Sequence, residues 1–276
     1  MPENETQGRV QKSMTNLLTG TGNIVSGAAE VARDATVATL QGAGDIAGSV
    51  SGTASQIVGG ALTAVHETGT GLVRTVKGVV VGLVEGVGEI ATVTVGVLSD
   101  TVRAAIKGTG TIGADVTTTA RGIAEGLITA TKDTGVSLAE GAFALGKTAV
   151  LGAKELGSDL IGTASSTVSG AVTGAATIGG DALAAIKDTA RGLVTGAGEV
   201  GGDIIGVTTG AISGAIAGAK EVGLSVEDAA SAAATGALEA AEKIGEAAVH
   251  AVTDVAASGV DGVKTVVRGQ ADTSEG

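Results

Sequence analysis

The chain has 276 residues, a formal net charge of −12, 43% apolar residues and a single aromatic residue, Phe143. The acidic balance, with a pI near 4.6, disfavours nucleic acid as a partner because phosphate binding requires a basic surface. A chain without cysteine forms no disulfides or thiolate metal sites, and a core almost free of aromatic side chains is unusual for an enzyme. We therefore expect no catalysis, no metal site, no cofactor and no small-molecule substrate.

Residues 1–16 are polar, and the sequence predicts a disordered N-terminal tail there. They lack the basic start, apolar stretch and cleavage site of a secretory signal. Glu85 and Glu89 interrupt the most apolar segment, residues 78–98, so no membrane span is expected. The predicted location is the cytoplasm, either free or peripherally on a lipid or granule surface.

From about Leu17 to Val266 the sequence keeps one 11-residue register. We expect residues 17–266 to form one amphipathic repeat region, and residues 267–276 to form a disordered C-terminal tail. Two rows of apolar residues, five positions apart, are predicted to form the face that binds an apolar surface or a partner. The first row contains Leu62, Val73, Val84, Val95, Ile106, Ile128, Val150, Ile161, Val172, Leu183, Val194, Ile205 and Ile216. The second contains Ile90, Ile112, Ile123, Leu145, Leu156, Ile178, Val200 and Val222.

This register favours helix over strand. Eleven residues make three turns at about 3.67 residues per turn, which holds each residue class at a fixed angle on an α-helix. A strand would need alternation with a period of two. The sequence thus predicts an all-α protein of long amphipathic helices with an 11- or 22-residue repeat. These helices would fold into hairpins or a bundle, or extend along a surface; a β-solenoid is the alternative for a repeat rich in Gly, Thr and Val.

Charged residues share the same register. Positions that are multiples of eleven often carry a cation, and an acid usually follows, as in Lys132-Asp133 and Lys154-Glu155. We interpret these pairs as a water-facing stripe. The two histidines, His66 and His250, lie on this polar side and are too few for a metal site.

Glycine is abundant, with 48 residues, and each glycine inside a helix costs about 0.8–1.0 kcal/mol relative to alanine. A helix of this composition should not persist alone in water, so it needs lipid or another helix to cover its apolar side. Glycine-rich segments at residues 20–22, 69–71, 108–113 and 196–202 are predicted to supply turns. Glycines in the middle of the apolar face are predicted to let two helices approach closely: Gly135, Gly146, Gly157, Gly179, Gly201 and Gly223.

Two strings in the sequence match nucleotide-binding patterns. Residues 141–148 read GAFALGKT, and in a phosphate-binding loop Lys147 and Thr148 would serve the phosphate and a magnesium ion. No strand precedes this string, and Lys147 stands in register with Arg103 and Arg191. The pattern GxGxxG occurs at residues 108–113 and 196–201, separated by a whole number of repeats. We interpret both strings as parts of the repeat.

The rhythm of Thr, Val and Gly with a lone lysine appears in TKDTGV at 131–136, GAKELG at 152–157 and GAKEVG at 218–223. In this respect most of the chain resembles the lipid-coating repeats of perilipins and synucleins. The resemblance implies a chain that becomes an extended helix on a lipid droplet or membrane surface. This chain differs from those families in being acidic and richer in glycine, and it lacks the lysine-dense synuclein hexamer.

The sequence thus predicts a non-enzymatic protein that coats an apolar surface, such as a neutral-lipid droplet, a storage granule or a membrane. The alternative is a self-assembling helical bundle or filament whose Gly- and Ala-rich faces pack together, so that the partner is a second copy of the chain. A protective role in desiccation or freezing is a weaker alternative, because such proteins also use 11-residue repeats.

Overall fold

The computed structural model describes residues 3–19, 23–41, 46–68 and 71–265, and these residues form twelve α-helices and no strand. The prediction of an all-α protein is therefore confirmed, and the β-solenoid alternative is wrong for the described chain. The helices are α1 (Glu3–Leu18), α2 (Ile24–Leu40), α3 (Ile46–Thr68), α4 (Leu72–Ile90), α5 (Val95–Thr111), α6 (Val116–Ala130), α7 (Leu138–Glu155), α8 (Leu160–Thr177), α9 (Ala182–Glu199), α10 (Ile204–Val222), α11 (Val226–Ile244) and α12 (Glu246–Ser258). A short 3-10 helix, η1 (Thr131–Asp133), follows α6.

Most of the helices begin at polar residues that cap them, whereas α4 and α12 begin after Gly71 and Gly245 without a side-chain cap. An N-cap side chain accepts a hydrogen bond from one of the otherwise unpaired N–H groups of the first turn. From α6 to α11 these caps recur at a constant interval of two 11-residue units: Asp115, Ser137, Asp159, Asp181, Asp203 and Ser225. One helix together with its turn therefore spans two of the predicted 11-residue units.

Glycines end many of the same helices. Five of them have a positive φ between 59° and 76° in the turns, Gly113, Gly157, Gly179, Gly201 and Gly223. Gly135 lies in the exposed bend before α7, with no neighbouring atom within 4 Å of where a Cβ would stand. Of the six glycines predicted to pack helices together, only Gly146 lies inside a helix contact. The prediction is wrong for the other five. These glycines recur at the same spacing as the turns, so each of them lies at the end of a helix and not in a contact between helices.

We expect Gly179→Ala to lower the free energy of unfolding by about 1–2 kcal/mol, because an L-residue in this left-handed conformation meets its own carbonyl oxygen. The φ of Gly179 is 68°. Asparagine tolerates this conformation better, so Gly179→Asn should cost less. Urea unfolding followed by far-UV circular dichroism would check the order; equal stability of Gly179→Ala and the native chain would contradict it.

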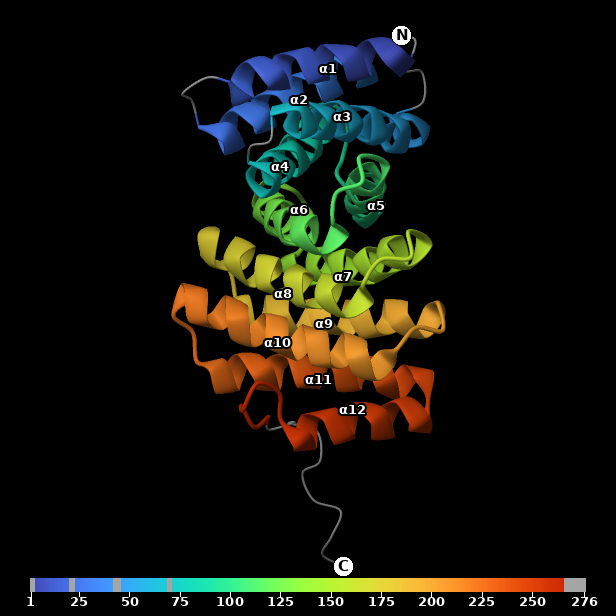
Figure 1. The fold of residues 1–276 in the computed structure, drawn as a ribbon, viewed down its shortest axis with the longest axis vertical. Helices are drawn as coiled ribbons and strands as arrows, with labels where there is room; N and C mark the ends of the chain where they lie inside the picture. The colour runs from blue at the N-terminus through green and yellow to red at the C-terminus, as the bar shows by residue number, and fades with distance from the viewer. Residues whose placement is uncertain (1–2, 20–22, 42–45, 69–70, 266–276) are drawn as a thin grey trace, which may run out of the picture.

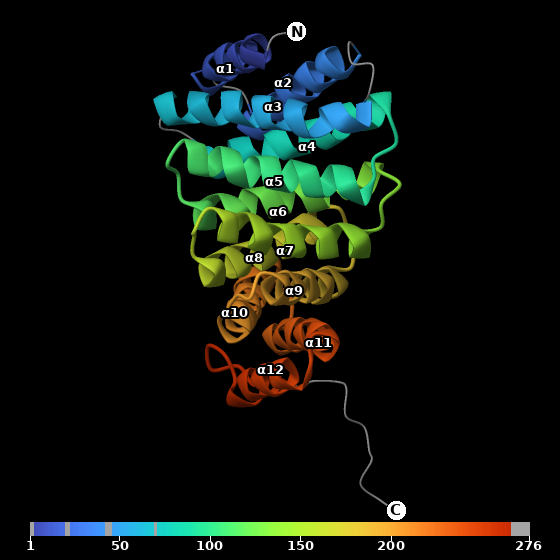
Figure 2. The same cartoon turned by 90° about the vertical axis from the view of Figure 1, so that its right-hand side faces the viewer.

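The helices stack along the long axis of the molecule in two columns (Figure 1, Figure 2). Consecutive helices run antiparallel, but each of α1 to α11 packs most extensively on a helix two places along the chain. The odd-numbered helices α1 to α11 form one column and the even-numbered helices form the other. The C-terminal end departs from this pattern, since α12 packs much less closely on α10 than α10 does on α8.

The two predicted apolar rows alternate between core and surface. In the first row, residues at mid-helix, such as Val84, Val150 and Val194, are fully buried, while the residues between them lie near helix starts and are partly open. Ile161 and Ile205, at the starts of α8 and α10, are 44% and 54% exposed. The second row alternates in the same way, since Leu145 is buried and Leu156 is 38% exposed. A continuous apolar strip along one helix becomes a core with an exposed edge once the chain folds back after every second repeat unit.

The N-terminal prediction is wrong for its described part. Residues 3–18 form α1, and this helix packs on α3 through the buried side chains of Val10 and Met14. The predicted C-terminal tail at residues 267–276 lies outside the described residues, as do 20–22 and 69–70 of the predicted turns. Among the described helices, none is both long and apolar enough to span a membrane.

Candidate functional site

The most regular contacts of the structure are made by glycines of the even-numbered helices. A methyl group on Gly122 or Gly126 of α6 would stand 2.5 Å from the carbonyl oxygen of Val73 or 2.6 Å from that of Lys77, both on α4. The same approach recurs where α4 meets α2, where α8 meets α6 and where α10 meets α8. We call the residues Gly78, Gly82, Gly122, Gly126, Gly170, Gly174, Gly210 and Gly214 the glycine ridge.

Members of the ridge recur once per helix pair. Gly82, Gly126, Gly170 and Gly214 follow one another with a 44-residue period, and each meets a backbone oxygen of the preceding even-numbered helix: Ala29, Lys77, Arg121 and Ser165 in turn. Without a side chain between the backbones, the Cα–H groups of one helix can approach the carbonyls of the next. These positions therefore require glycine, which explains why the chain tolerates its low helix propensity.

The odd-numbered helices use the same device in a less regular form. Gly192 of α9 meets the carbonyl of Phe143, and the predicted Gly146 of α7 meets the carbonyl of Thr189 on α9. Gly236 of α11 meets the carbonyl of Lys187. Gly152 of α7 instead meets the side chain of Ile106, at 3.1 Å for an added methyl group.

Ion pairs join helices two places apart, and all but the mostly buried Lys77–Glu125 lie on the water-facing side of the stack. The pairs have N···O distances of 2.5 to 3.1 Å, and their members lie on the same kind of helix, odd with odd or even with even: Lys77–Glu125, Arg103–Glu155, Lys147–Glu199 and Lys187–Glu239. Most are at least one-third exposed, so each adds little stability alone. Their regular recurrence fixes the register of one helix against the next.

One ion-pair site contains a buried carboxylate and connects three helices. Arg191 on α9 contacts the carboxylate of Asp188 at 2.8 Å and that of Glu239 on α11 at 3.5 Å. Its guanidinium also lies 5.2 Å from the ring centre of Phe143 on α7, within the range of a cation–π contact. Burial raises the pKa of Asp188 above its ordinary value, while Arg191 and Lys187 oppose that shift. Arg191 thus balances a carboxylate that is only 7% exposed.

The strings that resemble nucleotide-binding motifs form no phosphate loop. Residues 141–148 lie inside α7, where Lys147 pairs with Glu199 and Thr148 is buried. The two GxGxxG strings lie at the C-terminal ends of α5 and α9 and in the turns that follow. A phosphate cradle needs backbone N–H groups that are free to point at the ligand. Inside a helix those groups are already bonded, so residues 141–148 offer no such cradle.

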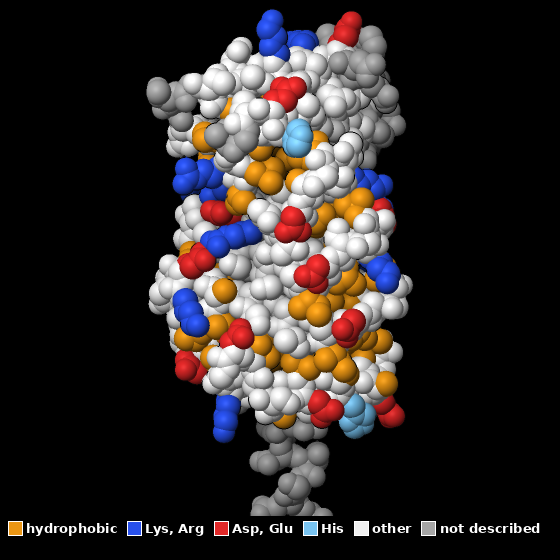
Figure 3. Space-filling model, viewed as in Figure 1, with side chains coloured by type: hydrophobic (Ala, Val, Ile, Leu, Met, Phe, Trp, Pro, Cys, Tyr) orange, Lys and Arg blue, Asp and Glu red, His pale blue; other side chains and the backbone are white. Residues whose placement is uncertain are grey.

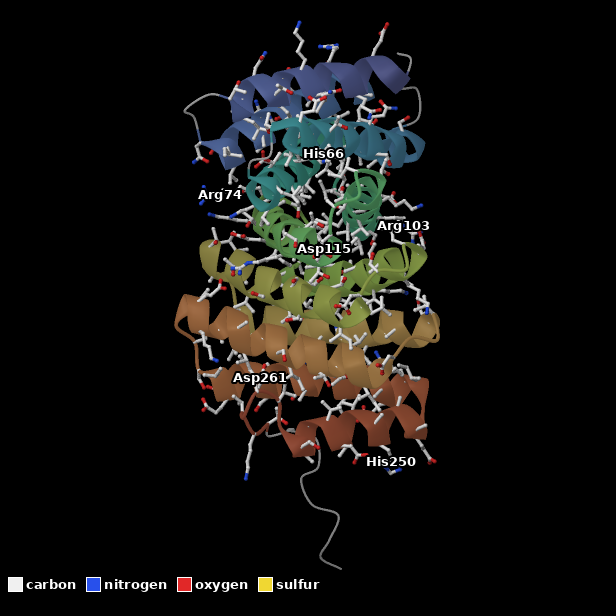
Figure 4. The ribbon with its side chains drawn as sticks, in the orientation of Figure 1. His66, Arg74, Arg103, Asp115, His250 and Asp261 are labelled. Atoms are coloured by element: carbon white, nitrogen blue, oxygen red, sulfur yellow. The ribbon has the colours of Figure 1, made fainter. Side chains whose placement is uncertain are left out.

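His66 on α3 and His250 on α12 are exposed and lie far apart along the stack (Figure 4). Within the described ranges, His, Asp and Glu residues form no group of three that is able to hold a metal ion. The water-facing pairs predicted from the sequence also lie at the surface, since Lys132, Asp133, Lys154 and Glu155 are all exposed. Their arrangement is that of a solvated face.

The fold and these contacts define a class: an all-α protein of antiparallel helices, held by glycine-to-backbone contacts. No model of a known protein family matches the chain, and no curated protein matches it either.

Sequence reasoning missed the glycine ridge and the Arg191 site. The signal for the ridge was present as a 44-residue recurrence of Gly82, Gly126, Gly170 and Gly214, hidden among many other glycines. The spacing of Asp188 and Arg191, three residues apart, is a local signal for part of this site, but the second partner, Glu239, lies 48 residues from Arg191. That pairing becomes visible only when helices two places apart are known to be neighbours.

Proposed function

We propose that the protein is a non-enzymatic structural protein, a self-packed stack of repeated helix pairs whose Gly- and Ala-rich faces hold the chain together. The observation that carries this proposal is the recurrence of glycine-to-carbonyl contacts along four successive interfaces of the even column. Such contacts need a partner backbone at a fixed position. A fluid lipid surface offers no such partner, so the positions of these glycines favour protein packing over coating.

Two measurements together test this proposal. In lipid-free buffer the chain should show the far-UV circular dichroism of an almost fully helical protein, with cooperative unfolding in urea. Sedimentation should report a compact particle. A disordered spectrum without lipid would contradict the proposal and would support the coating function.

A coat on an apolar surface remains a second candidate, and the exposed edge of the stack favours it. Leu156, Ile161, Ile205 and Ile244 are 38% to 54% exposed, and all four lie where an odd-numbered helix meets the following even-numbered helix. We call these four residues the apolar edge. Figure 3 shows hydrophobic side chains gathered in patches on the surface, with acidic groups between them. The resemblance to perilipin and synuclein repeats supports the same function.

Flotation with neutral-lipid droplets would test the coating function. If the folded stack binds through its edge, Ile161→Ser with Ile205→Ser should reduce the bound fraction while helicity stays unchanged. Thr118→Ser, at an exposed position on α6, provides a control that keeps the edge. Equal binding by both variants, or no flotation of the native chain, would remove this candidate.

A further inference from the structure

The groove between α10 and α12 combines an open helix face with an acidic rim. It has a volume of about 460 Å³, and its lining includes Ile205, Thr209 and Ser213 from α10 and Asp254 and Ser258 from α12. Ile205 is 54% exposed, the largest value among the exposed bulky apolar residues of the described chain. The groove is lateral to the glycine contacts described above and takes no part in them.

The structure of the neighbouring interface indicates what covers such a face. On α8, the backbone oxygens of Ile161 and Ser165 receive Gly210 and Gly214 of α10. The corresponding positions on α10, one helix pair later, are Ile205 and Thr209. The face that α8 buries under a pair of glycines is therefore repeated on α10, where it lines the groove.

Helix α12 cannot cover this face in the same way. The residues that follow Gly210 and Gly214 by one helix pair are Asp254 and Ser258, and α12 contains no glycine. A carboxylate cannot enter the space between two helix backbones without losing its hydration. This accounts for the loose packing of α12 on α10 and for the groove between them.

The end of the groove is held by the turn that follows α12. The hydroxyl of Ser213 donates to Asp261 Oδ2 at 2.9 Å, and Asp261 is labelled on this part of the stack in Figure 4. Asp261 has φ 51° and is the one non-glycine residue with a positive φ in the described ranges. Strained residues of this kind persist where surrounding contacts hold them. This turn covers the Ser213 end and leaves Ile205 and Thr209 open.

We propose that this groove docks a helix of a partner protein that carries two small residues four positions apart, with a cationic side chain beside them. The small pair would meet the backbone at Ile205 and Thr209, as Gly210 and Gly214 meet α8. The cation would face Asp254 and Asp261, whose charges complement it. This inference goes beyond the proposed structural function and does not depend on the exposed edge as a lipid contact.

The probe is a fluorescent peptide that copies residues 115–133, stapled into a helix on the side opposite Gly122 and Gly126. It carries the required chemistry, since Arg121 precedes this glycine pair. Saturable binding to the native full chain is expected by fluorescence anisotropy. Thr209→Leu should weaken binding about tenfold or more by filling the contact. Asp254→Lys should weaken it several-fold and remove its salt dependence.

Two controls separate docking from nonspecific binding, and one measurement separates it from misfolding. Thr253→Leu, at an exposed position of α12 outside the groove lining, should bind as the native chain does. A peptide with Gly122→Leu and Gly126→Leu should not bind. Circular dichroism of each protein variant should match the native spectrum, which also tests the proposed stack independently of docking.

Three results would overturn the proposal: no binding of the stapled peptide, equal binding by Thr209→Leu, or equal binding of the leucine peptide. Sedimentation of the native chain without peptide tests whether a second copy of the chain occupies the groove. If the chain forms dimers that Thr209→Leu abolishes, the groove binds a second copy and the assignment to a separate partner is wrong.

Discussion

Gly126→Leu should lower the free energy of unfolding by about 3 kcal/mol, at the upper end of the range for overpacked sites. Even a methyl group on Gly126 would stand 2.6 Å from the carbonyl oxygen of Lys77 and 3.1 Å from the Cβ of Val80. Both atoms belong to α4. The carbonyl oxygen of Lys77 is part of the helix backbone, so it cannot move away as a flexible side chain could. The leucine must push α6 away from α4, and the Lys77–Glu125 pair between these helices should open with it. Urea unfolding would measure the loss.

A glycine in open space provides the matched control. Gly52 lies inside α3 and is exposed, and no atom lies within 4 Å of where its Cβ would stand. Gly52→Ala should therefore stabilise the protein by about 0.8–1.0 kcal/mol through helix propensity alone. Gly126→Ala gains the same propensity but meets the α4 backbone, so its net effect should be destabilising. If both alanine variants were stabilised equally, the close contacts of the glycine ridge would not exist in solution.

Arg191→Ala should cost about 3 kcal/mol near pH 7, because it removes the ion-pair partner of the buried Asp188 carboxylate and leaves only the weaker influence of Lys187. The loss should shrink near pH 4. Burial raises the folded-state pKa of Asp188, so protonated Asp188 favours the folded state and its contribution is lost as the pH rises through that pKa. Without Arg191, which opposes the shift, the pKa rises further and the penalty at neutral pH grows. Urea unfolding at the two pH values would measure the difference.

A second variant shows whether Asp188 is the cause. Arg191→Ala combined with Asp188→Asn removes the unpaired charge, so it should regain most of the stability lost at pH 7 and show little pH dependence in this range. If Arg191→Ala alone lost the same stability at both pH values, the effect would come from its contacts with Phe143 and Glu239.

The sequence was sufficient to predict helices and an amphipathic pattern, because an 11-residue register is a property of each helix by itself. It also identified the apolar rows, of which mid-helix residues such as Val84 and Leu145 form the core. It located only some of the helix ends: α5 and α9 end within the predicted turns at residues 108–113 and 196–202, but most of the other turns were not identified. An 11-residue register continues unchanged through the turns, so a turn glycine such as Gly179 occupies the same phase as Gly146, which lies in a helix contact.

The candidate site was less predictable than the fold. Whether a glycine contacts another helix depends on which helices are neighbours, and here α1 to α11 each pack mainly on a helix two places along the chain. Gly126 and Gly52 look alike in the sequence but differ completely in their surroundings. The groove beside α10 depends on Asp254 falling at a ridge position, which requires the 44-residue spacing to be known first.

The pattern of helix contacts also bears on how the chain folds. Nearly all contacts between the described helices join elements at most two places apart along the chain, and the bidentate pair of Arg121 on α6 with Glu221 on α10 is an exception. Chains with mainly local contacts fold quickly, because little loop entropy is lost before native contacts form. Each new helix pair needs only the preceding pair to pack against. Helix pairs can therefore add in chain order, starting at the N-terminus, as the chain leaves the ribosome. In evolution such a protein would then lengthen in steps of one helix pair. An insertion of any other length would place a residue with a side chain where a ridge glycine must meet the backbone of the preceding even-numbered helix.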